Sequence, residues 1–186
     1  MNAAELLLGP AALERHGART ALICGDQTVS FAELAERVAR SGAALAGLGA
    51  RPGDRVLMLM RDTPEFAAAW LGAVRFGAVA VALNSKASEA DYRHILADSG
   101  ARLVLIEDVF AAARPDLTAE LAREGRIVVA GTASGLPGWR ERLAAARPLA
   151  PFDAAPETPA FLLYSSGTTG KPKGIVHAHR ALACVG

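Results

Sequence analysis

The sequence predicts an α/β fold in which a largely parallel sheet is covered by helices on both faces. Three observations support this prediction. Segments 55–60, 79–83 and 102–106 are almost continuous apolar runs, which is the pattern of a strand buried on both faces. Segments with helical periodicity separate these runs. Finally, 52% of the 186 residues are hydrophobic and only 5% are aromatic, a composition that suits alanine-rich helices packed on aliphatic strands.

The first elements precede the parallel strands. Segment 3–15 has a helical pattern with a break near its middle, where Gly and Pro are adjacent. Segments 20–24 and 28–29 are expected to form a small hairpin around a Gly-Asp turn. Ser30 and Glu33 have the spacing of a capping box, so a helix is expected to start there.

The later elements continue the alternation of strands and helices. Pro64 suits the first turn of a helix that runs to Phe76. Ser88 and Asp91 form a second capping-box pattern. The other expected elements are a helix at 88–98, two weaker helices at 109–113 and 117–123, a strand at 126–129 and a helix at 139–146.

A polar stretch lies between an apolar strand at 159–163 and a second strand at 175–177. Its glycines allow the backbone to approach a ligand, its hydroxyls can donate to phosphate oxygens, and its lysines add positive charge. The spacing fits neither a P-loop nor a dinucleotide fingerprint, and Pro172 excludes a helical continuation. A plain surface loop would have a similar composition. The candidate ligand-binding residues are Ser165, Ser166, Gly167, Thr168, Thr169, Gly170, Lys171, Lys173 and Gly174.

The order of residues 165–174, SSGTTGKPKG, resembles the phosphate loop of the adenylate-forming (AMP-binding) superfamily. Segments 28–34, 47–56 and 77–84 resemble this family too, and the flanks at 161–164 and 175–179 are most similar to the benzoate and 4-hydroxybenzoate CoA ligases. The resemblance implies that the nine candidate residues contact the ATP phosphates, with Lys173 favoured over Lys171.

The same resemblance implies a reaction. A carboxylic acid–CoA ligase activates an acid, here an aromatic one, as an acyl-adenylate and transfers the acyl group to CoA. ATP, Mg²⁺ and CoA are therefore the implied cofactors, and a small carboxylic acid is the implied substrate. We expect the chain to have three parts. They are a βα-repeated core at 1–131, a proline-rich connection at 132–158, and a phosphate-loop hairpin with the start of the next helix at 159–186.

By resemblance, the chain is an N-terminal fragment of such a ligase. The family's adenine- and ribose-binding segments, its hinge and its C-terminal lid domain with the catalytic lysine would all follow the loop, so no catalytic residue is expected here. The fragment alone is expected to be inactive and to self-associate through exposed aliphatic faces. Fatty-acyl or amino-acid activation remains an alternative, as does a stand-alone, non-catalytic module that binds nucleotide or a partner protein.

Composition excludes other classes of function. The formal net charge is +1 without a basic block, which argues against a nucleic-acid partner. No uncharged stretch is long enough to span a bilayer. Cys24 and Cys184 have no metal-binding spacing and are expected to be small buried side chains, so a reducing, cytoplasmic setting is expected.

Other residues that could carry chemistry are expected to be structural. His177 and His179 would share one side of a strand, but with no third ligand nearby we expect hydrogen bonds and no metal site. Trp70 and Trp139 are expected in the core. The arginines at 51, 55, 61 and 75 lie at element ends and are expected to be solvated.

Overall fold

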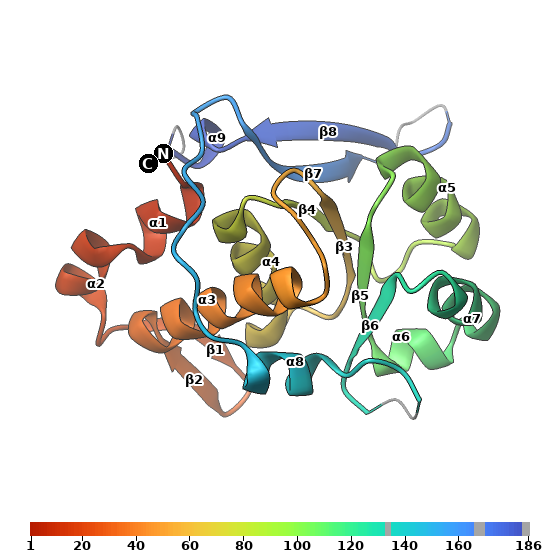
Figure 1. Ribbon diagram of the computed structural model, residues 1–186, viewed down its shortest axis with the longest axis horizontal. Coiled ribbons are helices and arrows are strands. Elements are labelled where there is room, and N and C mark those ends of the chain that lie inside the picture. The colour runs from red at the N-terminus through yellow and green to blue at the C-terminus, as the bar shows by residue number, and fades with distance from the viewer. Residues whose placement is uncertain (133–134, 166–169, 184–186) are drawn as a thin grey trace.

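A computed structural model describes residues 1–132, 135–165 and 170–183 (Figure 1). In these residues the main sheet has six strands in the order β6-β5-β3-β4-β7-β8. Neighbouring strands are parallel, except that β7 and β8 are antiparallel. The predicted α/β fold is confirmed. The strands are β3 Arg55–Leu59, β4 Val79–Ala82, β5 Leu103–Glu107, β6 Ile127–Ala130, β7 Pro159–Ser165 and β8 Lys173–Ala178.

Helices cover both faces of the sheet, with α1, α3, α4 and α8 on one side and α5, α6 and α7 on the other (Figure 1). Along β3, Val56 and Met58 pack into the first core and Leu57 and Leu59 into the second. This explains why the strand is a continuous apolar run. The helices are α1 Ala3–Leu8, α3 Phe31–Gly47, α4 Pro64–Phe76, α5 Glu89–Ser99, α6 Asp108–Ala112, α7 Pro115–Arg123 and α8 Trp139–Ala145.

The helix starts follow the local sequence signals. The Ser30 side chain accepts a hydrogen bond from the Glu33 N–H at 3.2 Å, and the Glu33 carboxylate accepts one from the Ser30 N–H at 2.8 Å. Ser88 and Asp91 form the second predicted capping box at α5. The Thr63 side chain caps α4 at the position expected before Pro64. Both predicted capping boxes are therefore confirmed.

Helices α3 and α4 pack against each other with almost no space between their backbones. A Cβ added to Gly72 of α4 would lie 2.5 Å from the Ser41 Cβ and 2.9 Å from the Val38 carbonyl oxygen, both in α3. On the α3 side, a Cβ at Gly42 would lie 3.0 Å from the Gly72 carbonyl oxygen. Glycine at these two positions is what allows the close approach.

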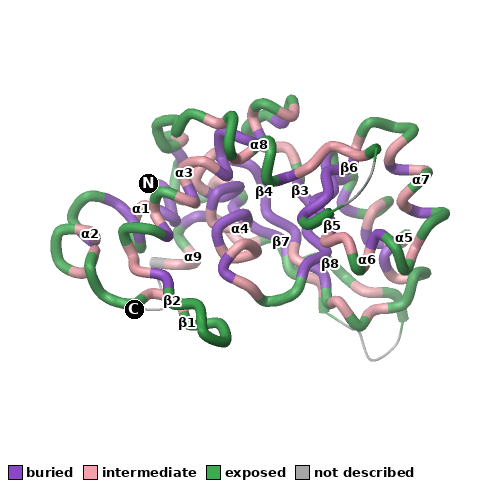
Figure 2. Tube along the Cα trace, turned by 90° about the horizontal axis from the view of Figure 1, so that it is seen from below, coloured by how far each residue is buried: buried purple, intermediate pink, exposed green. Residues whose placement is uncertain are grey.

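The N-terminal region adds a second, small sheet. The helical segment is broken as predicted, into α1 and α2 Pro10–His16. Strands β1 Thr20–Cys24 and β2 Gln27–Ser30 form the predicted antiparallel hairpin. Figure 2 shows this hairpin as largely exposed, in contrast to the buried strands of the main sheet. The expectation that Cys24 is buried is wrong, because Cys24 is the last residue of strand β1 and is exposed there.

A long connection leads from β6 to β7 and contains α8. Strand β7 pairs with β4, for example through Ala80 and Phe161, and so lies on the opposite side of β3 and β4 from β6. The connection therefore has to pass over the sheet. On the way, Trp139 is fully buried in the core, as expected. The exact division of the chain at residues 131 and 158 stays a prediction.

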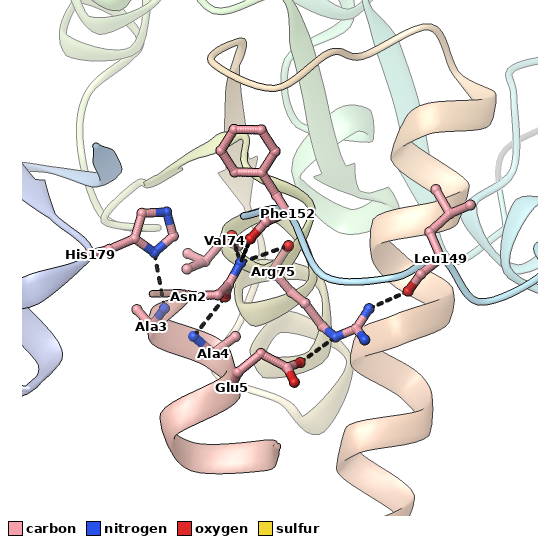
Figure 3. Close-up of polar contacts among 9 residues, drawn as sticks. All are labelled: Asn2, Ala3, Ala4, Glu5, Val74, Arg75, Leu149, Phe152 and His179. Carbon is pink, nitrogen blue, oxygen red and sulfur yellow. Dashed lines mark hydrogen bonds and ion pairs between the residues drawn. The ribbon is translucent and has the colours of Figure 1, made fainter. Parts of the chain in front are cut away.

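The N-terminus ties three distant segments together (Figure 3). The Asn2 side-chain amide donates to the Arg75 carbonyl oxygen at 2.9 Å and to the Phe152 carbonyl oxygen at 3.0 Å. The next residue, Ala3, donates its N–H to His179 Nδ1 at 3.0 Å. Helix α1 is thus attached to the end of α4, to the connection before β7 and to the end of β8.

Arg75 belongs to the same group of contacts (Figure 3). Its Nε donates to the Glu5 carboxylate at 2.7 Å and its Nη1 to the Leu149 carbonyl oxygen at 2.6 Å. Its side chain is only 17% exposed. The expectation that Arg75 is solvated is therefore wrong, and its partners explain why, since they lie 70 and 74 residues away in sequence.

Within the described residues, no helix combines the length and the apolar composition that a crossing of the bilayer requires.

Candidate functional site

The candidate loop lies at the carboxyl end of β7. Strand β7 ends at Ser165, β8 begins at Lys173, and these two residues face each other in the antiparallel register. The loop is therefore a connector between two strands, as the sequence indicated. Of the nine candidate residues, Ser166, Gly167, Thr168 and Thr169 lie outside the described residues.

The described part of the loop is open to solvent. Ser165, Lys171 and Lys173 are exposed, and a Cβ added to Gly170 would meet no atom of the described residues within 4 Å. The register places a hydroxyl and an ammonium side by side at the mouth of the loop, on Ser165 and Lys173. Hydroxyl and ammonium groups are hydrogen-bond donors that suit phosphate oxygens. The donor set thus fits a polyphosphate.

Gly174 has a packing role in this structure. A Cβ at this position would lie 3.0 Å from the ring carbon Cζ of Tyr164 and 3.2 Å from the Leu162 Cδ2. The ring of Tyr164, which faces Gly174 in the register, occupies the space that a side chain would need. The close approach at Gly174 is therefore to a neighbouring aromatic ring.

Helix α5 holds both limbs of the loop. Tyr164, the residue before Ser165, donates its hydroxyl to the Asp98 carboxylate at 2.6 Å. On the other limb, His94 Nε2 lies 2.9 Å from the Pro172 carbonyl oxygen. A carbonyl oxygen can only accept, so this nitrogen carries the proton. The second capping box fixes the start of the helix that presents both side chains.

The hydroxyl of Tyr164 remains a donor at ordinary pH. Burial of the ring and, next, the hydrogen bond to Asp98 raise the pKa of Tyr164 well above its usual value. A neutral phenol next to a carboxylate gives a charge-assisted hydrogen bond, which is stronger than a neutral one. Asp98 and His94 are missing from the candidate residues because 66 and 78 residues separate them from their partners, and no local pattern marks either contact.

The two histidines after the loop have structural roles. His179 is fully buried, and its Nδ1 accepts the Ala3 N–H (Figure 3). Burial and then the N-terminal amine lower the pKa of His179, which keeps the ring neutral. His177 stacks on the Phe161 ring with 4.6 Å between ring centroids. The expected hydrogen bond is confirmed for His179. In the part of the chain that the structure describes, no three His, Cys, Asp or Glu side chains gather where they could hold a metal ion.

Similarity to known proteins extends over nearly the whole chain. The family model for the AMP-binding enzymes matches residues 10–185. The 3-hydroxybenzoate–CoA ligase of Aromatoleum sp. (strain CIB) is 40% identical over 96% of the chain. The fatty acid–[acyl-carrier-protein] ligase ScoC of Streptomyces coeruleorubidus is 34% identical over 89% of it. These matches cover 35% and 31% of the two ligases, so the chain spans about a third of the length of these relatives.

Solved structures of ligases are also similar to the chain. A benzoate CoA ligase from Burkholderia xenovorans LB400 superposes with a TM-score of 0.83 and 33% sequence identity. The match covers 100% of the chain and 36% of that ligase. The shared architecture therefore includes the whole chain.

Proposed function

The chain belongs to the AMP-binding enzyme family, and we propose that it forms the phosphate-binding part of an ATP-dependent carboxylic acid–CoA ligase with an aromatic acid as substrate. The observation that carries the proposal is the stretch 165–174, with its hydroxyls, glycines and lysines, placed between the paired ends of β7 and β8. The similarity to ligases of 3-hydroxybenzoate and benzoate supports the aromatic substrate. A cytoplasmic location goes with this proposal, because ATP and CoA are its substrates.

The proposed chemistry has two steps. An oxygen of the acid attacks the α-phosphorus of ATP, the bond from that phosphorus to the β-phosphate oxygen breaks, and pyrophosphate leaves with the electron pair. The thiolate of CoA then attacks the carbonyl carbon of the acyl-adenylate, and AMP leaves. ATP enters as its magnesium complex, in which the phosphate oxygens themselves are suitable ligands for the ion.

The loop would act on the first of these steps. Negative charge develops on the leaving pyrophosphate, and pre-placed donors stabilise charge that grows in the transition state. The Lys173 ammonium and the Ser165 hydroxyl would contact the phosphates from the mouth of the loop, with Lys171 between them and the tip. The contacts from α5 to Tyr164 and Pro172 would keep the two limbs in place.

The whole reaction is proposed for a protein that contains this chain together with the rest of a ligase. Because the chain spans about a third of its curated relatives, we expect the 186 residues alone to form no acyl-adenylate. Exchange of labelled pyrophosphate into ATP, dependent on an added carboxylic acid, is the measurement. Exchange above background by the 186-residue chain would contradict this expectation.

The main experiment uses the same exchange assay on the full-length ligase. Benzoate and its 3- and 4-hydroxy derivatives should support exchange better than a fatty acid or an amino acid. Lys173→Ala should lower the exchange rate by about 100-fold, the effect of removing one donor to developing charge. Arg123→Ala is the matched control, because it removes an exposed positive charge on α7. Equal losses in the two variants would count against the loop.

Fatty-acid activation is the second candidate, since ScoC also matches most of the chain. The same panel of acids separates the two, because a fatty acid would then give the fastest exchange. A stand-alone module without catalytic activity would show nucleotide binding but no exchange with any acid, even in the full-length protein.

We also propose that the isolated chain self-associates through the β7–β8 hairpin. Leu163, Ile175 and Val176 are 42%, 51% and 58% exposed, and β8 is paired on one side only within the described residues. Exposed apolar side chains on an unpaired edge strand favour association. Light scattering should show oligomers of the isolated chain, and the Val176→Lys variant should be monomeric. A monomer at high concentration would refute this proposal.

A further inference from the structure

A second candidate site lies away from the phosphate loop, between β3 and β5. The chain leaves β3 through α4 toward β4 on one side, and it leaves β5 through α6 and α7 toward β6 on the other side. The two connections therefore diverge from neighbouring parallel strands, with α4 on one face of the sheet and α6 and α7 on the opposite face. In open α/β sheets, ligands bind in the crevice at the carboxyl ends of the strands where the connections diverge.

A cavity of about 470 Å³ is found at this place, and we call it the switch-point cavity. Met60, directly after β3, and Glu107, at the end of β5, contribute to its wall. Helix α3, the start of α4, helix α8 and Gln27 of strand β2 supply the rest. The volume lies within the range of about 300–1,000 Å³ that is usual for small-molecule sites.

The charged side chains of the cavity leave a surplus of positive charge. Arg40 is paired with Glu36, and Glu107 is paired with Arg61. By contrast, Arg37 and Arg140 have no carboxylate within 4.0 Å in the described parts of the chain. They are thus available to bind an anion.

Glu65 is the remaining charged group in the cavity. Burial raises the pKa of its carboxyl group, while the positive charges of Arg140 and Arg37 act in the opposite direction. No hydrogen bond to its side chain is found among the described residues. Even with Glu65 ionised, Arg37 and Arg140 together exceed it by one positive charge.

The rest of the wall combines apolar side chains with the polar Gln27, Ser41 and Thr63. Met60, Ala68 and Leu143 line the cavity together with Trp139. The Trp139 indole Nε1 is buried and has no hydrogen-bond partner within the described residues. A buried donor without an acceptor is costly, and such groups in native structures often mark a place where a water or a ligand supplies the acceptor.

From this geometry we infer that the switch-point cavity binds a small organic anion, whose charged group contacts Arg37 and Arg140 and whose apolar body lies against Met60, Leu143 and Trp139. This site is separate from the phosphate loop, because β3 and β4 stand between β5 and β7 in the sheet. The inference does not depend on the proposed ligase reaction.

Trp139 provides a local signal for the test. The chain has two tryptophans, so Trp70→Phe leaves Trp139 as the only source of indole fluorescence. Trp70 lies in α4, packs against Phe161 and does not line the cavity, and phenylalanine is a conservative replacement for it. Benzoate is the probe anion, benzamide is its neutral counterpart, and inorganic phosphate is an anion without an apolar body.

Benzoate should change the Trp139 emission in a saturable way at millimolar concentrations, and benzamide and phosphate should bind more weakly. Arg37→Gln and Arg140→Gln together should weaken benzoate binding by about tenfold or more, as expected for the loss of charge-assisted hydrogen bonds. Arg123→Gln, on exposed α7, is the charge-matched control and should leave binding unchanged.

Three outcomes would overturn the inference. They are no saturable response to benzoate, equal binding of benzamide, and equal binding of phosphate. Unaltered benzoate affinity in the double arginine variant would refute the assigned contacts. If that variant fails to fold, as judged by circular dichroism, the comparison of the three probes on the Trp70→Phe chain still decides.

Discussion

The close contact between α3 and α4 makes a sharp prediction about Gly72. Replacing it by alanine should destabilise the fold, although alanine is the better helix former. The added Cβ would lie 2.5 Å from the Ser41 Cβ, 2.9 Å from the Val38 carbonyl oxygen and 3.0 Å from the Gly42 nitrogen. None of these atoms is the end of a flexible side chain, so relief requires a shift of one helix against the other.

Two opposing effects set the size of the change. Alanine in a helix interior gains about 1 kcal/mol over glycine. Overpacking a well-packed core costs about 1–3 kcal/mol. Because the contacts at Gly72 involve backbone and Cβ atoms of α3, we expect the upper end of that cost. The net loss of unfolding free energy for Gly72→Ala is then about 2 kcal/mol.

Gly47, in the last turn of α3, is the matched control. No atom in the described part of the chain would lie within 4 Å of a Cβ added there. Gly47→Ala should therefore show the helix-propensity gain alone, about 0.5–1 kcal/mol. Urea unfolding followed by circular dichroism should move the two midpoints in opposite directions. A Gly72→Ala chain as stable as the wild type would refute the packing argument.

Three other contacts give predictions. Because the pKa of His179 is lowered in the folded chain, the unfolded chain takes up the proton first, and the free energy of unfolding should fall as the pH drops below about 6.5. In urea titrations, His179→Gln should reduce this pH dependence, and an unchanged slope would rule out His179 as its source. Tyr164→Phe removes the hydrogen bond to Asp98 and should cost about 1 kcal/mol in thermal unfolding, whereas Asp98→Asn, which retains an acceptor, should cost less. Equal losses would count against this contact. Asn2→Ala leaves two carbonyl oxygens without their donor and should cost about 1–3 kcal/mol in the same assay, so a variant with wild-type stability would show that these contacts contribute little.

Local features of the fold could be predicted from the sequence because their signals lie close together. Ser30 and Glu33 are three residues apart and form the capping box that their spacing indicated. The apolar run after Arg55 became a strand with one core on each face. In both cases the side chains that determine the structure are neighbours in the chain.

Features that depend on distant partners could not be predicted in this way. Arg75 was expected in solvent because no residue near it in sequence indicates that Glu5, 70 positions away, is its partner. The contact from His94 to Pro172 crosses 78 residues, so the positioning role of α5 was missed. The switch-point cavity was missed for the same reason, since its walls come from α3, α4 and α8.

The attachment of the N-terminus has a consequence for biosynthesis. Helix α1 leaves the ribosome before the segments that hold it, because the Nδ1 atom that accepts the Ala3 N–H belongs to a residue made 176 positions later. The Phe152 carbonyl that Asn2 needs is made 150 positions after it. Contacts between such distant residues form only after the intervening chain is available. Complete docking of α1 therefore waits for residue 179. A nascent chain that stalls before this residue could hold α1 through Arg75 but would lack the His179 contact, which leaves the helix less protected from proteases.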